Sequence, residues 1–87
     1  AGKAKAFEIY PNPVVNDRIY LLSRITTEDK ARISLIDLQG RKLKSFEQRL
    51  EEGLQYIIDL PQDIPVGEYI FRAESKGYLL NEKLVVN

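Results

Sequence analysis

The stretch LPQDIPVGEYIFRAE, residues 60–74, decides the fold class. In its second half, Tyr69, Phe71 and Ala73 recur with a period of two, which is typical of a β-strand with one buried face. Its first half carries Pro61 and Pro65 and is too long for a tight hairpin, so we expect it to cross from one sheet to another. A strand that follows such a crossover predicts two packed sheets.

The same alternation occurs elsewhere in the chain. It is found in FEIY (7–10), RIYLLSR (18–24), ARISLID (31–37), GLQYIIDL (53–60) and EKLVV (82–86). The residues expected on the buried faces are Ile19, Leu21, Ile33, Leu35, Leu54, Tyr56, Ile58, Leu60, Leu84 and Val86. Turns separate the strands at TTED (26–29), DLQGRK (37–42), EEG (51–53) and SKG (75–77). This spacing predicts an all-β, immunoglobulin- or fibronectin-like β-sandwich of about seven antiparallel strands.

One segment, LKSFEQRLEEG (43–53), fits two structures. Leu43, Phe46 and Leu50 lie at helical spacing, and Gly53 could end a helix. The neighbouring strands favour a fourth strand through 41–48 instead. We expect the strand, with a helix as the alternative.

The composition limits the chemistry available to the chain. Thirteen basic residues balance thirteen acidic ones among 87, which argues against nucleic-acid binding and against a polybasic membrane surface. With no histidine and no cysteine, the chain cannot form Ser-His or Cys-His catalytic groups, the usual zinc sites or disulfides. We therefore expect no catalysis, no metal and no other cofactor.

The sequence also bears on processing and membranes. No apolar run approaches the roughly 20 residues that cross a bilayer, and AGKAKAF (1–7) is too short and too polar for a signal peptide. Because the chain has no methionine, we expect an excised domain or a processed product.

The segment YPNP, residues 10–13, places an asparagine between two prolines near the start of the chain. Proline fixes φ at about −65° and removes a backbone donor, so the first strand should lose continuous pairing here, with Asn12 free to bond the adjacent turn. We expect the domain to span residues 7–87. Residues 1–6 would be a linker, an expression remnant or the stretch near a cleavage site.

Five segments, read in order, resemble a known family. They are YPNP (10–13), VVNDRIYL (14–21), LIDLQGRKL (35–43), IIDLPQDIPVGEYIFRA (57–73) and NEKLVVN (81–87). The series resembles the C-terminal sorting domain (type A) of cargo proteins exported by the type IX (Por) secretion system of Bacteroidetes bacteria. The resemblance runs from about Phe7 to Val86. One departure is Ile64, where the family usually has leucine, and this swap conserves volume.

The resemblance implies a set of motif residues. They are Pro11, Asn12, Pro13, Asn16, Asp17, Asp37, Gly40, Arg41, Ile58, Asp59, Leu60, Gly67, Tyr69, Lys83, Leu84, Val85 and Val86. It also implies an immunoglobulin-like sandwich that acts as an address for an attached cargo. The implied partners are an outer-membrane translocon, its shuttle barrel and a cell-surface sortase of cysteine-protease type that removes the domain. Such a cargo passes through the periplasm to the cell surface or the medium.

Several motif residues also have purely structural interpretations, which we favour. Gly40 would supply a turn, and Tyr69 would form a tyrosine corner. Asp37 and Asp59 would cap strand ends, and we discount an acid-base pair between them. A calcium site built from Asn16, Asp17 and Asp63 is also discounted, because the spacing matches no known loop.

The last strand is the strongest candidate for recognition. A C-terminal strand at a sheet edge offers unpaired backbone and alternate side chains to a partner strand, a mode called β-augmentation. Lys83 would either be read by the secretion machinery or simply protect this edge from self-association.

Two other functions are consistent with the sequence. A fibronectin-like accessory module that binds glycan or protein would need a row of surface aromatics, and Tyr10, Tyr20 and Tyr78 are the tyrosines expected outside the core. A plain spacer domain would have no partner at all.

Overall fold

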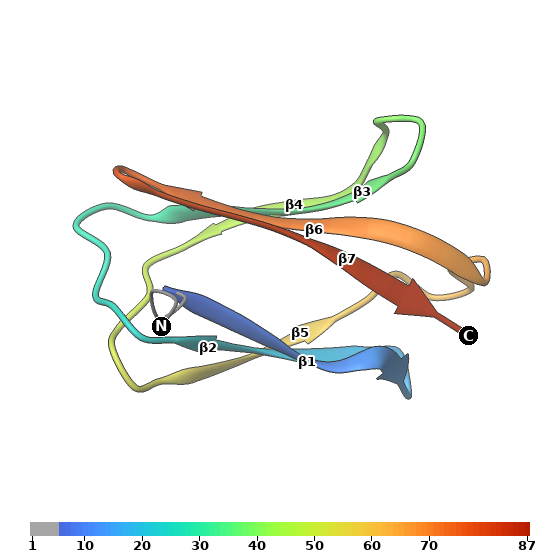
Figure 1. Ribbon diagram of the computed structural model, residues 1–87, viewed down its shortest axis with the longest axis horizontal. Helices are drawn as coiled ribbons and strands as arrows, with labels where there is room; N and C mark the ends of the chain where they lie inside the picture. The colour runs from blue at the N-terminus through green and yellow to red at the C-terminus, as the bar shows by residue number, and fades with distance from the viewer. Residues whose placement is uncertain (1–5) are drawn as a thin grey trace, which may run out of the picture.

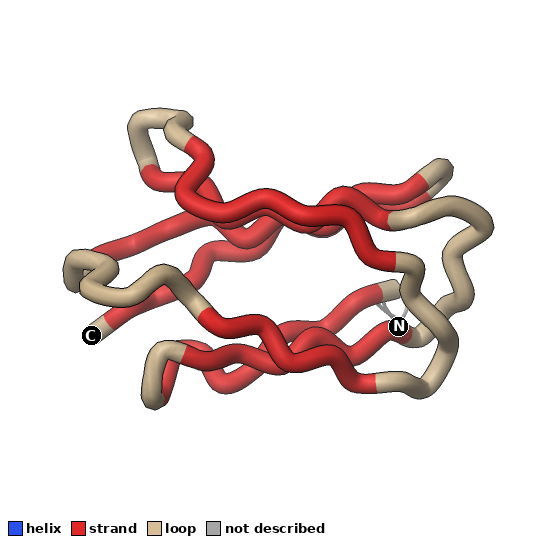
Figure 2. Tube along the Cα trace, turned by 180° about the vertical axis from the view of Figure 1, so that it is seen from behind, coloured by secondary structure: helices blue, strands red, loops and turns tan. Residues whose placement is uncertain are grey.

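The computed structural model describes residues 6–87, which form two antiparallel sheets packed face to face (Figure 1). The strands are β1 (Phe7–Val15), β2 (Arg18–Ser23), β3 (Ala31–Asp37), β4 (Lys42–Gln48), β5 (Gln55–Asp59), β6 (Gly67–Ser75) and β7 (Tyr78–Val86). Figure 2 shows strands and connecting loops, without a helix in the described chain. The predicted all-β sandwich of seven strands is confirmed.

The chain crosses between the sheets three times. One sheet has the order β1-β2-β5 and the other β4-β3-β6-β7, so the loops after β2, β4 and β5 each change sheet. The predicted crossover at 60–67 is therefore confirmed. In constant-type immunoglobulin domains the fourth strand joins the first, second and fifth, whereas here β4 pairs with β3.

The core lies between the sheets and is built from the inward positions of the strands. Its largest fully buried side chains include Phe7, Ile19, Leu21, Ile33, Leu50, Phe71 and Leu84. Nearly all of the residues that the period of two predicts on the buried faces do pack in the core. Leu54 is the exception, because it precedes β5 and is 47% exposed.

The ambiguous segment 43–53 forms β4 followed by a loop, so the strand prediction is confirmed. The β3–β4 register passes from Leu35↔Lys44 to Ile36↔Lys42, which leaves Leu43 as the extra residue of a bulge. Leu43 is consequently exposed, while Phe46 packs on the core. The helical spacing arises from this bulge and the following loop.

Two side chains bridge the open sides of the sandwich. On one side the Asn12 amide of β1 bonds the backbone of β7, donating to the Lys83 carbonyl at 2.7 Å and accepting from the Val85 N–H at 2.9 Å. On the other side Lys44 of β4 donates to the carbonyl of Asp59 in β5 at 2.5 Å. Both bridges tie the edge of one sheet to the edge of the other.

The connections fall at two opposite ends of the sandwich (Figure 1). Because neighbouring strands run in opposite directions, the β1–β2, β3–β4 and β5–β6 connections lie at the end where β7 finishes. We call this end the C-terminal pole and define it as residues 16–17, 37–41, 59–69 and 83–87. The other connections lie at the opposite end.

Candidate recognition surface

The motif residues gather at or beside the C-terminal pole. The Asn-Asp pair forms the β1–β2 turn, the Asp-x-x-Gly-Arg segment forms the β3–β4 turn, and the Gly-x-Tyr segment follows the β5–β6 crossover. Pro11, Asn12 and Pro13 lie beside them, since Asn12 bonds the end of β7. Segments up to 73 residues apart in sequence thus meet at one end of the molecule.

Asp37 organises the β3–β4 turn. Its Oδ1 accepts the backbone N–H groups of Gln39 and Arg41, both at 2.9 Å, and its Oδ2 accepts Arg41 Nε at 2.8 Å. Gly40 takes the positive φ (+91°) that the reversal needs. The backbone hydrogen bond from Arg41, with that residue's side chain, holds the pKa of the Asp37 carboxyl below its usual value.

The β1–β2 turn and the end of β5 are joined by one backbone bond. Asn16 and Asp17 both have positive φ, 58° and 54°, which is the geometry of a type I′ hairpin turn. The Asp17 carbonyl accepts the Leu60 N–H at 2.9 Å. Arg18 and Asp59, an opposed pair on β2 and β5, form an exposed ion pair at 2.8 Å, and its hydrogen bond raises the pKa of Arg18.

Tyr69 forms the predicted tyrosine corner. Its ring is buried and its hydroxyl donates to the Pro65 carbonyl at 2.5 Å, four residues upstream. The corner and the β3–β4 turn enclose a surface pocket of about 370 Å³. Exposed Leu38 and Val66 lie on its rim, so the pole presents apolar as well as charged groups.

The last strand is divided between core and surface. β7 is an edge strand, as expected, but Leu84 and Val86 are buried. Lys83 is exposed and pairs with Glu68 at 3.2 Å. A partner that reads the folded domain can therefore contact Lys83, and it cannot contact the side chains of Leu84 and Val86.

The expectation that Asn12 bonds the adjacent turn is wrong. The β1–β2 register is interrupted between Tyr10 and Val15, as the prolines predict, and both X-Pro bonds here are cis. The Asn12 amide instead makes the two bonds to β7 that a residue of a parallel strand would make. A side chain replaces backbone pairing at this point.

The two carboxylates considered for an acid-base pair lie apart. Asp37 and Asp59 lie on different sheets, and each is paired with its own arginine. Within residues 6–87, no three acidic side chains come together in a way that could hold a metal ion. The same residues include no helix with the length and apolarity needed to cross a bilayer.

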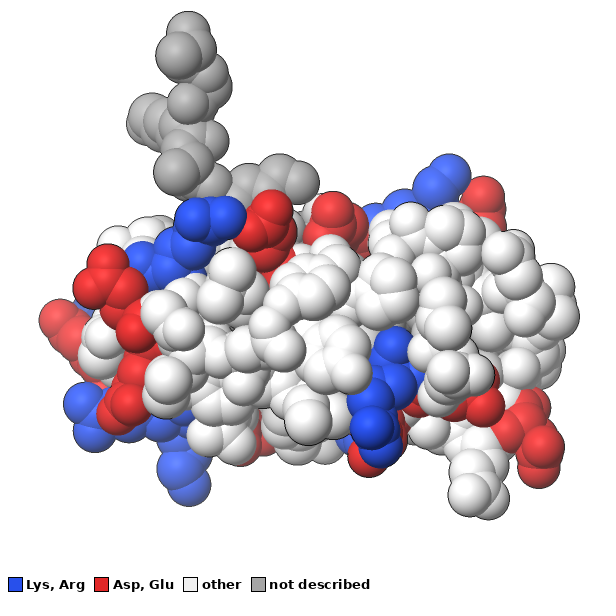
Figure 3. All heavy atoms as spheres, turned by 90° about the horizontal axis from the view of Figure 1, so that it is seen from below, with Lys and Arg blue, Asp and Glu red and all other residues white. Residues whose placement is uncertain are grey.

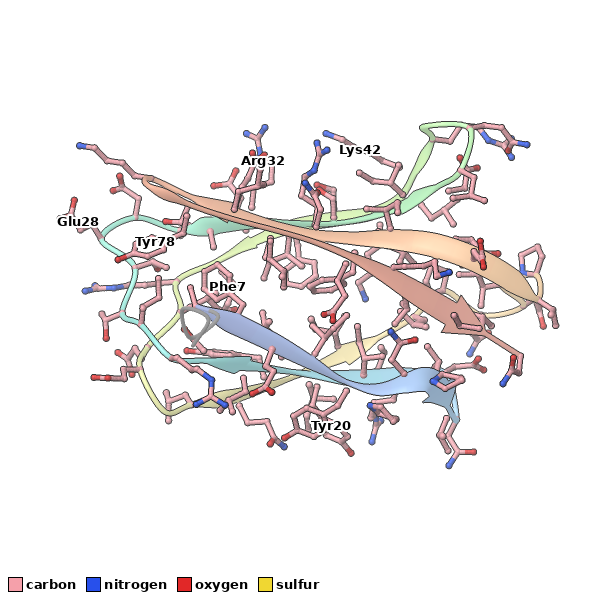
Figure 4. The ribbon with its side chains drawn as sticks, viewed as in Figure 1. Phe7, Tyr20, Glu28, Arg32, Lys42 and Tyr78 are labelled. Atoms are coloured by element: carbon pink, nitrogen blue, oxygen red, sulfur yellow. The ribbon has the colours of Figure 1, made fainter. Side chains whose placement is uncertain are left out.

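The outer face of the β1-β2-β5 sheet carries two of the three tyrosines expected outside the core. Figure 3, the view from the β1-β2-β5 side, shows acidic and basic side chains interspersed around an uncharged centre. Tyr10 and Tyr20 stack there with ring centroids 5.6 Å apart, and Tyr20 points away from the core (Figure 4). Tyr78 begins β7 in the other sheet, so the three tyrosines do not form the row that a binding module would need.

Comparison with known proteins gives one family. The family model for the secretion system C-terminal sorting domain matches residues 8–87, almost the whole chain. The chain belongs to this family. The sorting domain is thus a C-terminal sorting signal for type IX secretion, which implies contact with the type IX machinery and export to the cell surface or beyond. No curated protein matches the chain.

Two features of the sorting domain could not be identified from sequence. Lys44, the bridge to β5, looked like an ordinary charged residue of an edge strand. Glu68, which pairs with Lys83, occupies the unspecified position of the Gly-x-Tyr segment. Asn12 itself gives an indication of the bridge to β7. Its side-chain amide lies between two prolines, which have no backbone N–H groups, so it is suited to bond a neighbouring strand where the backbone cannot.

Proposed function

We propose that the secretion machinery reads the sorting domain at its C-terminal pole. The outer-membrane translocon and its shuttle barrel would hold this end while the attached cargo passes outward. A cell-surface sortase of cysteine-protease type would then separate the domain from the cargo. The domain itself would carry out no reaction, as befits a family that is not known to be catalytic.

One observation supports the pole above all others. The family motifs are scattered from residue 11 to residue 86, yet the fold brings them to one end. Some of them, including Tyr69 and Leu84, are buried and build the pole. Lys83 and Arg41 are exposed and would be available to a partner.

Lys83 offers a direct test, because its ion pair with Glu68 is exposed and exposed pairs contribute about 0–1 kcal/mol to stability. In a type IX-competent bacterium, a reporter fused to residues 1–87 should be exported. Lys83→Ala should lower the exported fraction several-fold and leave the melting temperature nearly unchanged. Lys76→Ala, at the turn of the opposite end, is the matched control and should export normally.

Two results would contradict the proposal. Retention of the wild-type fusion in the periplasm would show that these residues are not a sufficient signal. Full export of Lys83→Ala would remove Lys83 from the recognised surface.

A further inference from the structure

Most of the sheet edges in residues 6–87 have a structural feature that opposes pairing with another strand. In β1, Pro11 and Pro13 remove backbone donors. β4 and β5 are tied together by Lys44, a charged side chain at an inward position of an edge strand. The second half of β7 is closed by Asn12, which occupies the Lys83 carbonyl and the Val85 N–H.

The first half of β7, residues 78–81, has no such feature among the described residues. β6 and β7 pair in unbroken antiparallel register from Ser75↔Tyr78 to Gly67↔Val86. In such a ladder the N–H and C=O of one residue point to the same side, and successive residues alternate. Since the Val85 N–H and the Lys83 carbonyl point away from β6, the backbone groups of Leu79 and Asn81 also point outward.

The side chains around this segment are those that exposed edges normally lack. Leu79 is 62% exposed and Tyr78, at the end of the molecule away from the C-terminus, is 46% exposed (Figure 4). Natural edge strands usually carry lysine, proline or a bulge where their backbone is unpaired. An exposed leucine beside outward backbone groups that no residue of 6–87 is shown to bond is suited to a partner strand.

We propose that Leu79–Asn81 of β7 accept an extended strand of another protein by β-augmentation. The outward N–H and C=O groups of Leu79 and Asn81 would bond that strand, and Leu79 would contact an apolar side chain on it. Pairing would stop before Lys83, whose carbonyl is already bonded by Asn12. This site lies on the opposite half of β7 from the C-terminal pole, and it depends on the proposed function only for its readout, export.

A second copy of the chain fits this edge poorly. Antiparallel pairing centred on Leu80 would place Leu79 opposite Asn81 of the other copy, an apolar side chain against an amide. Pairing centred on Leu79 would run into the β6–β7 turn, where Gly77 has a φ of 84°. A strand of different sequence has neither restriction.

Proline at position 79 tests the backbone directly. Leu79→Pro removes an outward N–H while the bonds to β6 stay in place, so the domain should fold with little loss in melting temperature. Leu79→Thr is the matched control, because it shortens the apolar side chain and keeps the N–H. In the reporter fusion we expect Leu79→Pro to lower export about tenfold or more and Leu79→Thr to stay within about twofold of wild type. Asn81→Pro, at the next outward position, repeats the test if Leu79→Pro does not fold.

Each alternative outcome is distinguishable. Wild-type export is scored first, so its failure counts against the proposed function. Normal export of a folded proline variant would overturn strand addition at this edge. An equal loss with Leu79→Thr would show that the side chain is read instead of the backbone. A dimer in sedimentation velocity of residues 1–87 that Leu79→Pro abolishes would identify the partner as a second copy and also overturn the proposal.

Discussion

At the scale of single residues, buried or hydrogen-bonded motif residues determine the shape of the C-terminal pole. The Asp37 carboxylate accepts three hydrogen bonds within its own turn, and the Tyr69 hydroxyl fixes the end of the β5–β6 crossover through one. These roles could be predicted from sequence, because the partners lie within four residues. The hydrogen bonds of a turn can be predicted from sequence when donor and acceptor are close together in the chain.

Asp37 makes stability depend on pH in a defined direction. Its pKa lies below 3.8 in the folded state, so its contribution is fully present above that value and is lost as the pH falls through the folded pKa. We expect Asp37→Asn to lower the melting temperature by several degrees at pH 7. The gap to wild type should narrow as the pH falls below 3.8.

The measurement is thermal unfolding of both proteins across this range. Gln39→Ala is the control, because it leaves the Asp37 carboxylate and its backbone bonds in place, and its gap to wild type should not vary with pH. A gap for Asp37→Asn that stays constant into acid would contradict the assignment.

At the scale of elements, the strands were predictable and their lateral contacts were not. Alternation with a period of two predicts that Ile33, Phe71 and Leu84 are buried, whichever strands lie beside theirs, and all three are buried. The bulge at Leu43 and the exposure of Leu54 depend on pairing and loop geometry that the pattern does not encode. The Asn12–Val85 bond, across 73 positions, is beyond any local pattern.

The bridge between β1 and β7 can be tested by a nearly isosteric change. Asn12→Asp keeps an acceptor for the Val85 N–H but replaces the donor that faces the Lys83 carbonyl. We expect a loss of about 1–2 kcal/mol in the free energy of unfolding, because that carbonyl loses its partner and faces an oxygen. Hydrogen exchange at Val85 and urea unfolding provide the two measurements.

Asn16→Asp is the matched control for this change. It alters an exposed turn residue that aspartate can also occupy at positive φ, so it should cost little. Equal losses in the two variants would show that Asn12 does not bridge the sheets.

At the scale of the whole molecule, the last strand contributes both to the core and to the surface that a partner could contact. Alternate residues of β7 face the core and the solvent, so a terminal apolar motif need not be a surface signal. The convergence of the motifs at one pole follows from the antiparallel direction of neighbouring strands, which was predictable, whereas the order of the strands in each sheet was not.

Neighbouring residues of β7 should differ in how much they contribute to stability. Leu84→Ala should lower the free energy of unfolding by about 2–5 kcal/mol, because it opens a cavity at a fully buried position. Val85→Ala, half-buried on the other side of the strand, should cost less than about 1 kcal/mol. Chemical denaturation gives both values, and a loss for Val85→Ala as large as that for Leu84→Ala would contradict the assigned orientation of β7.

The bridge from Asn12 to Val85 also makes the C-terminal pole depend on the first and the last strand together. Because this contact joins residues 73 positions apart, we expect this part of the fold to form late. A chain truncated before residue 83 would lack both the backbone that Asn12 bonds and the core side chains of Leu84 and Val86. Under the proposed function, such a chain would not present a complete pole, and its attached cargo would not be exported.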